Sequence, residues 1–142
     1  GGNDILDLNW KIIKLLCTKQ KIVVIDNKKT LNVNNKNIKI LHKVNDEILA
    51  SYMAKARIAI TTASMSLCEL SFLKVATIAI AIKENQRNGL KQMLKYNIAT
   101  DYIDIKNLND LPLKIKALPQ NISTPIKANG IKNIMQYLKG LL

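Results

Sequence analysis

Two short polar segments carry the residue types that could bind a phosphorylated ligand. The first is the run from Ala63 to Ser66, which is followed by Glu69, and the second is the pair Asn85 and Gln86. Serine hydroxyls and free backbone N–H groups at the start of a helix can donate hydrogen bonds to phosphate, and the helix dipole favours an anion there. A carboxylate one helical turn further on can accept hydrogen bonds from a ribose diol. We therefore expect a nucleotide to bind near these segments.

Each of these residues also has a purely structural interpretation. Ser64 and Ser66 could cap the helix that follows them, a role for which serine is well suited. Glu69 could pair with a lysine on the surface of that helix. Asn85 and Gln86 could simply satisfy the polar groups of a turn. The sequence alone leaves these alternatives open.

Strand and helix patterns alternate along the chain and predict the elements that would position these side chains. The predicted helices are residues 4–17, 47–55, 64–73, 86–96, 108–118 and 127–141, and the predicted strands are residues 21–25, 37–41, 58–61, 76–82 and 99–103. Strands separated by helices are typical of βαβ units. We predict an α/β, Rossmann-like fold with a mainly parallel sheet and helices on both faces. In such folds ligands bind at the carboxyl ends of the strands, where both polar segments fall.

The charge of the chain does not by itself indicate a nucleic-acid partner. The formal net charge is +12, but lysines supply nearly all of it, because Arg57 and Arg87 are the only arginines, and aromatic residues make up 4%. Proteins that read nucleic acids rely on arginine for bidentate contacts and on exposed aromatic rings for stacking. We interpret the lysines as surface cations and expect no nucleic-acid partner, although a modest role in attracting an anionic ligand stays open.

The length and composition also disfavour membrane-spanning, secreted, disulfide-linked and metal-binding classes of protein. No apolar run approaches the roughly 18 to 20 residues of a membrane span, and no signal-peptide pattern is present, so we expect a cytoplasmic protein. Cys17 and Cys68 lie in apolar helical patterns and are expected to be packed, reduced thiols. With one histidine and two cysteines in 142 residues, we expect no metal site.

A few further side chains are assigned by their positions in the predicted elements. Trp10 and Met53 fall in apolar helical registers and are expected in the core. Asn97 is expected to end a helix, as asparagine tolerates the left-handed conformation found there. His42 is the single histidine, and we interpret it as a surface or packing residue, not as a general base.

Four segments in the order and spacing of one family occur in the chain. They are Gly-Gly-x-Asp at residues 1–4, a Met-containing helix at residues 52–56, Glu69 after a strand that ends in small residues, and Asn85-Gln86. Together they resemble the C-terminal domain of nucleotide-sugar enzymes with the glycosyltransferase-B fold. The resemblance covers nearly the whole chain and is greatest to the bacterial UDP-2,4-diacetamido-2,4,6-trideoxy-β-L-altropyranose hydrolases of pseudaminic acid biosynthesis, which serve flagellin glycosylation. Many relatives have glycines where this chain has residues 63–66, and side chains there restrict the approach of a diphosphate.

The resemblance implies that residues 1–142 form a single UDP-binding domain, the C-terminal half of a two-domain enzyme. That enzyme would hydrolyse a UDP-deoxy-diacetamido sugar to UDP and the free sugar, with the catalytic base in the missing N-terminal domain. The chain alone would then hold no catalytic residue, need no cofactor and show little turnover. The implied nucleotide-binding residues are Lys43, Val44, Ser64, Met65, Ser66 and Glu69, and the implied phosphate- or sugar-binding residues are Gly2, Asn3, Asn85 and Gln86.

Two alternatives to the hydrolase stay open. A glycosyltransferase of the same fold, such as the N-acetylglucosaminyltransferase of peptidoglycan synthesis, would share this type of domain. An interaction module that has lost its ligand would suit the glycine-poor run at residues 63–66. Likeness of fold cannot decide between these activities.

Overall fold

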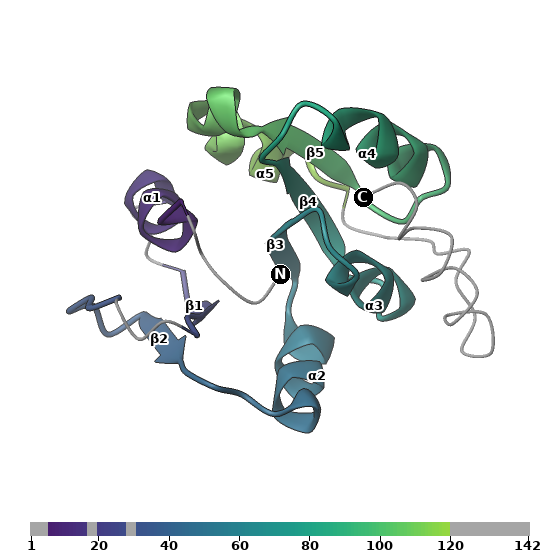
Figure 1. Cartoon of the computed structure of the whole chain (residues 1–142). Coiled ribbons are helices and arrows are strands. Elements are labelled where there is room, and N and C mark those ends of the chain that lie inside the picture. Colours follow the sequence, from purple (N-terminus) through teal and green to yellow (C-terminus); the bar gives the residue numbers. More distant parts are fainter. Residues whose placement is uncertain (1–5, 17–19, 28–30, 120–142) are drawn as a thin grey trace. The chain divides into compact units, whose positions relative to one another are not determined.

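The computed structural model describes residues 6–16, 20–27 and 31–119 (Figure 1). The chain divides into two compact units, Gly1–Tyr52 and Met53–Leu142, and we describe each by itself. The elements, in chain order, are α1 (Leu8–Leu16), β1 (Ile22–Ile25), β2 (Ile38–Leu41), α2 (Asp46–Lys55), β3 (Ile58–Thr62), α3 (Ser66–Phe72), β4 (Ala76–Ala81), α4 (Gln86–Lys95), β5 (Asp101–Asp104), the 3-10 helix η1 (Ile105–Asp110) and α5 (Leu111–Ala117). The predicted helix at 127–141 and Cys17 lie outside the described residues.

The first unit contains a parallel pair of strands. Strands β1 and β2 run in register from Ile22 opposite Ile38 to Ile25 opposite Leu41. The N–H of Asp26 continues the ladder by donating to the carbonyl of Leu41 at 2.9 Å. Parallel pairing of two short apolar strands is what the sequence pattern predicts.

The expectation that Trp10 lies in the core is wrong. Its side chain is 42% exposed, and the Lys14 ammonium lies 5.3 Å from the centre of its ring. The buried residues of α1 are Leu8 and Ile13, and Trp10 stands about 200° around the helix axis from Leu8. A short helix buries one stripe of its surface, so Trp10 faces away from that stripe. Met53 is only half-buried.

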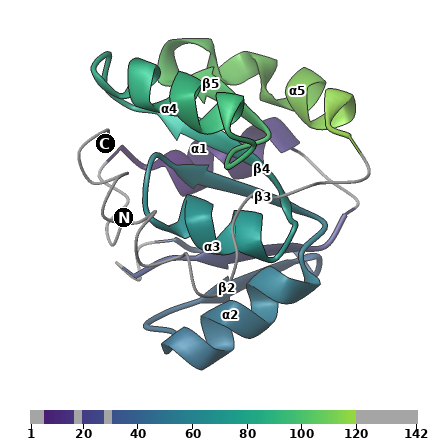
Figure 2. The ribbon, with the colours of Figure 1, turned by 90° about the vertical axis from the view of Figure 1, so that its right-hand side faces the viewer.

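The second unit contains a three-stranded parallel sheet in the order β3-β4-β5. Ile58 lies opposite Ala76, and Ile78 lies opposite Asp101. Helices α3 and α4 lie on one side of the sheet, whereas η1 and α5 lie on the other side of β5 from α4 (Figures 1 and 2). The central strand β4 is buried at every residue. The predicted α/β, Rossmann-like class with parallel strands is therefore confirmed.

The core of this unit forms where α3 and α4 pack on the strands. Its buried residues are Leu67, Cys68, Ala79, Ala81, Leu90, Met93, Ile98 and Ala99. The small alanines of β4 let both helices approach the sheet closely, while the larger side chains come from the helices. The expectation that Cys68 is a packed thiol is confirmed.

Both helices on this side end in the same way. Asn97 has φ 56°, its N–H bonds to Leu94, and the N–H of Ile98 bonds to Met93 at 2.8 Å. Lys74 has φ 58°, and the N–H of Val75 bonds to Leu70 at 3.0 Å. These are Schellman motifs, which satisfy the last carbonyl groups of a helix. The prediction that Asn97 ends its helix is confirmed.

Some predicted boundaries differ from the observed ones. Helix α3 begins at Ser66 instead of residue 64, and β5 begins at Asp101 instead of residue 99. The predicted helix 108–118 is divided between the end of η1 and α5, and Pro112 stands in the first turn of α5. Proline favours a helix start since it lacks an N–H that would need a partner. None of the helices in the described ranges has the length and apolar character that crossing a bilayer requires.

Candidate functional site

The two polar segments leave the sheet at the same edge. Thr62 at the end of β3 lies opposite Ile80 in β4, and the N–H of Ala63 donates to the carbonyl of Ile80 at 3.3 Å. The turns that follow β3 and β4 are therefore neighbours at the carboxyl ends of two paired parallel strands. This is the position at which open α/β sheets bind ligands.

The first turn presents backbone and hydroxyl groups instead of a side-chain cap. The N-cap residue of α3 is Met65, in helical conformation and without a side-chain capping bond. The hydroxyl of Ser64 lies 3.5 Å from that of Thr61, and the carbonyl of Ser64 accepts the N–H of Leu67. The interpretation of Ser64 and Ser66 as side-chain caps of α3 is therefore wrong, because the turn closes through backbone hydrogen bonds.

The side chains of this turn are divided between the core and the surface. Ala63 and Met65 pack against the core of the second unit, so Met65 has only its backbone to offer a ligand. Glu69 is exposed, and none of the ion pairs among the described residues includes it. The alternative in which Glu69 pairs with a surface lysine thus has no support in the part of the chain that the structure describes. Its carboxylate is open to solvent, within α3.

The second turn orients the carboxamide of Gln86. Its Oε1 accepts the N–H of Ile82 at 2.9 Å and the N–H of Lys83 at 3.2 Å. Because a backbone N–H can only donate, the oxygen must face these groups and the NH₂ must face away from them. The satisfied-turn interpretation therefore holds for the oxygen of Gln86, while its two N–H donors point away from the turn.

The neighbouring residues of this turn are open to solvent. Asn85 is exposed and makes no side-chain capping bond to α4. Glu84 has an 85% exposed side chain that lies 3.8 Å from Arg87, so its carboxylate is largely solvated. The side chain of Asn85 is consequently free to meet a ligand from solvent.

Two of the nucleotide-binding residues implied by the resemblance, Lys43 and Val44, belong to the first unit. Lys43 follows β2 with φ 48°, and Val44 leads toward α2, whose start is capped by Asn45 accepting the N–H of Ile48 at 2.8 Å. The ring Nδ1 of His42 lies 2.5 Å from the carbonyl of Asp26, so Nδ1 carries the proton. This contact agrees with a packing role for His42. Gly2 and Asn3 lie outside the described residues.

An ion pair that the sequence interpretation missed ties α4 to β5. Arg87 Nε donates to Asp104 Oδ2 at 2.6 Å, and Arg87 Nη2 also contacts that oxygen. The other oxygen of Asp104 accepts the N–H of Lys106 at 3.0 Å. The Lys106 N–H and the Arg87 guanidinium hold the pKa of the Asp104 carboxyl below its usual value, and Asp104 raises the pKa of Arg87. The feature of the sequence that could have pointed to this ion pair is that Arg87, one of only two arginines, directly follows Gln86.

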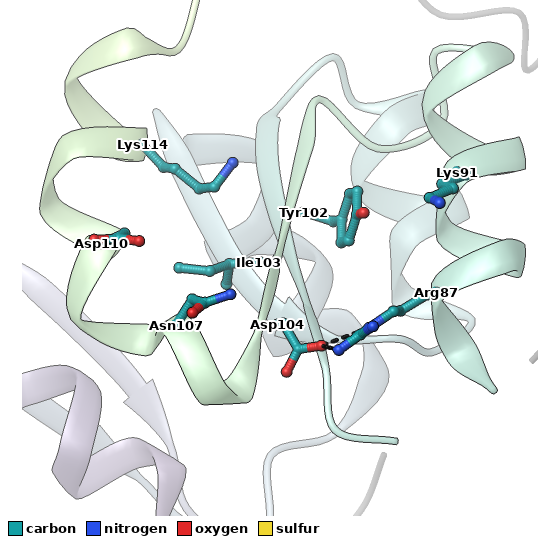
Figure 3. Close-up of a pocket in the computed structure, with 8 residues that line it drawn as sticks. All are labelled: Arg87, Lys91, Tyr102, Ile103, Asp104, Asn107, Asp110 and Lys114. Atoms are coloured by element: carbon teal, nitrogen blue, oxygen red, sulfur yellow. Dashed lines mark hydrogen bonds and ion pairs between the residues drawn. The ribbon is translucent and has the colours of Figure 1, made fainter. Parts of the chain in front are cut away.

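A cavity of about 400 Å³ lies along β5 between α4 and α5 (Figure 3). It is lined by Arg87, Lys91, Tyr102, Ile103, Asp104, Asn107, Asp110 and Lys114. Two ion pairs contribute to its walls: Arg87 with Asp104, and Lys114 with Asp101 at 3.0 Å. None of the residues predicted to bind nucleotide or sugar lines this cavity. No residue of the polar turns after β3 and β4 lines it either.

Within the described ranges, no group of three or more His, Cys, Asp or Glu side chains could hold a metal ion. The fold and the two turns define the class as an α/β protein with parallel open sheets and a polar surface at the carboxyl ends of β3 and β4. Comparison with known proteins finds no family model, no curated protein and no solved structure that matches the chain.

Proposed function

We propose that this chain binds the UDP part of a nucleotide sugar. The observation that carries the proposal is the orientation of Gln86, whose carboxamide donors face away from a turn that adjoins the serine-containing turn at residues 63–66. Two sets of hydrogen-bond donors at neighbouring strand ends suit the oxygens of a diphosphate and its sugar. Charged acceptors also strengthen the bonds that such donors make.

Each proposed contact follows from the chemistry of its residue. Ser64 and Ser66 donate hydroxyl hydrogen bonds to phosphate, and the exposed carboxylate of Glu69 accepts the ribose hydroxyls. Asn85 and Gln86 donate to phosphate or sugar oxygens. Lys43 and Val44 belong to the first unit, and their part in binding the nucleotide stays a prediction from the resemblance.

For the intact protein we propose hydrolysis of a UDP-deoxy-diacetamido sugar, with a further domain that supplies the base for the attacking water. Donors placed beforehand around the diphosphate would stabilise the negative charge that develops on the leaving UDP. We assign hydrogen bonding to the ligand, and not general-base catalysis, to the described residues of the site. The chain by itself would therefore bind without appreciable turnover.

The test is a titration of the chain with UDP in which binding is measured by calorimetry and by NMR. We expect a dissociation constant on the order of 0.1 to 1 mM, which corresponds to about 4 to 5.5 kcal/mol. The shifted resonances should include those of Ser64, Ser66, Glu69 and Gln86. Shifts scattered over surface lysines, or equal binding of all nucleotides, would count against a specific site.

A matched pair of variants tests the ribose contact. Glu69→Gln keeps the shape of the side chain and removes its charge, so UDP binding should weaken by about 1 to 2 kcal/mol. Glu84→Gln makes the same chemical change at a solvated position and should leave binding unchanged. If both variants bind UDP as the parent does, Glu69 has no part in binding.

A second candidate is an interaction module without a nucleotide ligand. It is favoured by the side chains of Ala63 and Met65, which occupy the first turn and pack against the core. Failure of UDP and of UDP-sugars to bind at millimolar concentration would support this alternative.

A further inference from the structure

We propose that Arg87 and Asp104 form a positioning pair that holds the first turn of α4, so that the carboxamide of Gln86 presents its donors to the ligand. This inference rests on the proposed function, because it concerns the same turn. It adds two residues that neither the spacing nor the resemblance had assigned to the site.

The first turn of α4 is attached to the ends of two strands. Gln86, the first residue of the helix, is bonded through Oε1 to the N–H groups of Ile82 and Lys83, directly after β4. Arg87, the next residue, reaches to Asp104 at the end of β5 (Figure 3). Since the two residues are consecutive, a shift of the Arg87 backbone would also move the backbone of Gln86.

Backbone hydrogen bonds of 3.1 Å close this turn, from the N–H of Gln86 to Lys83 and from the N–H of Arg87 to Glu84, but other side chains give it little support. Asn85 makes no side-chain capping bond, and Glu84 lies at 3.8 Å from Arg87 with its side chain largely in water. Exposed ion pairs of that kind contribute little. The Arg87–Asp104 pair is more protected, with the Asp104 side chain 12% exposed. The pair is therefore the main side-chain attachment of the turn to β5.

The geometry of the pair indicates positioning instead of direct ligand binding. One oxygen of Asp104 accepts from Nε and contacts Nη2 of Arg87, and the other oxygen is held by the N–H of Lys106. Both oxygens of the carboxylate are thus engaged, which fixes its direction. The negative charge of Asp104 also offsets the positive charge of the Arg87 guanidinium, which would otherwise attract a phosphate.

The experiment compares Arg87→Ala and Asp104→Asn with Lys114→Ala in titrations with UDP. If the pair positions the turn, Arg87→Ala and Asp104→Asn should both weaken UDP binding by about 3- to 10-fold, the effect of losing one well-aligned hydrogen bond. Lys114→Ala breaks the other ion pair of β5 and should change binding by less than about 2-fold. If Arg87 instead contacts phosphate directly, Asp104→Asn should tighten binding, since it frees the guanidinium. Tighter binding, or no change in either variant, would overturn the inference.

A measurement without ligand separates this inference from the proposed function. Amide hydrogen exchange at Ile82 and Lys83 reports whether the Gln86 oxygen still accepts their N–H groups. Exchange at both should speed up in Asp104→Asn and stay as in the parent in Lys114→Ala, with the exchange of Leu90 in α4 as the internal reference for global stability. Unchanged exchange in Asp104→Asn would refute the positioning role. A parent protein that binds no UDP would refute only the proposed function.

Discussion

Thr77 and Thr100 are joined by two hydrogen bonds at the start of the β4–β5 pairing. The N–H of Thr77 donates to Oγ1 of Thr100 at 2.9 Å, and the N–H of Thr100 donates to the carbonyl of Thr77 at 3.0 Å. Thr77 is only 1% exposed, so water cannot replace the hydroxyl of Thr100 as an acceptor. A side chain thus takes the place of a carbonyl in the ladder.

Replacement of Thr100 by valine should destabilise the protein by about 1 to 3 kcal/mol, because it leaves the buried N–H of Thr77 without an acceptor. Thr100→Ser keeps the hydroxyl and should cost less than about 1 kcal/mol. Denaturant unfolding of the two variants measures both effects. Valine keeps the γ-methyl group and serine keeps the hydroxyl, so a loss for serine as large as that for valine would contradict the assigned role of the hydrogen bond.

Truncation of a buried leucine of α4 should have a larger effect. Leu90 belongs to the core of the second unit, so Leu90→Ala removes packed methyl groups and should cost about 2 to 5 kcal/mol. Leu113 in α5 is 69% exposed, and Leu113→Ala should change stability by less than about 0.5 kcal/mol. Thermal unfolding of the two variants should rank them in this order. Similar losses would contradict the burial assigned to these two helices.

A glycine at position 74 should stabilise the chain. Lys74 is exposed and adopts φ 58°, a left-handed conformation that costs a residue with a Cβ atom but not glycine. Lys74→Gly should therefore raise the free energy of unfolding by about 0.5 to 1 kcal/mol. Lys91→Gly, in the interior of α4, should lower it by about 1 kcal/mol. A destabilised Lys74→Gly variant would show that the lysine side chain contributes more than its conformation costs.

The thiol of Cys68 should be unreactive in the folded protein. Burial, together with the nearby carboxylate of Glu69, raises the pKa of the Cys68 thiol to about 11. At about pH 8 roughly one molecule in a thousand would then carry the reactive thiolate. In a Cys17→Ser protein, a thiol reagent should label Cys68 only after denaturation. Rapid labelling of the folded protein would contradict the packing of α3.

The pair between Arg87 and Asp104 should make stability depend on acid pH. The pKa of Asp104 is lowered in the folded state, so its stabilising effect is complete above the unfolded value of about 4 and is lost as the pH falls through the folded value. The difference in unfolding free energy between the parent and Asp104→Asn should therefore be constant near neutral pH and shrink in strong acid. Urea unfolding at about pH 7 and at about pH 2.5 tests this sign. A difference that grows on acidification would contradict the assigned pairing.

The sequence predicted the elements well wherever a periodic pattern agreed with a local stop signal. Strand β4 is buried throughout because both of its faces are covered, and Asn97 ends α4 where it was predicted to do so. The pattern was least informative where backbone geometry decides the outcome. The predicted helix at 108–118 proved to be a 3-10 helix followed by α5, and α3 begins after a turn closed by its own backbone instead of by a serine cap.

In the candidate site, too, some features follow from the sequence pattern and others depend on the tertiary structure. The sequence by itself determined that polar turns follow two apolar strands, because the alternation of buried and polar residues specifies where strands end. It could not determine that Met65 turns toward the core, that Trp10 faces solvent, or that Gln86 directs its oxygen to Ile82. Only the tertiary structure decided these orientations and the pairing of Arg87 with Asp104. The physical reason is that a side chain's partners come from neighbouring elements, and the spacing of residues along one element does not specify which neighbours it will meet.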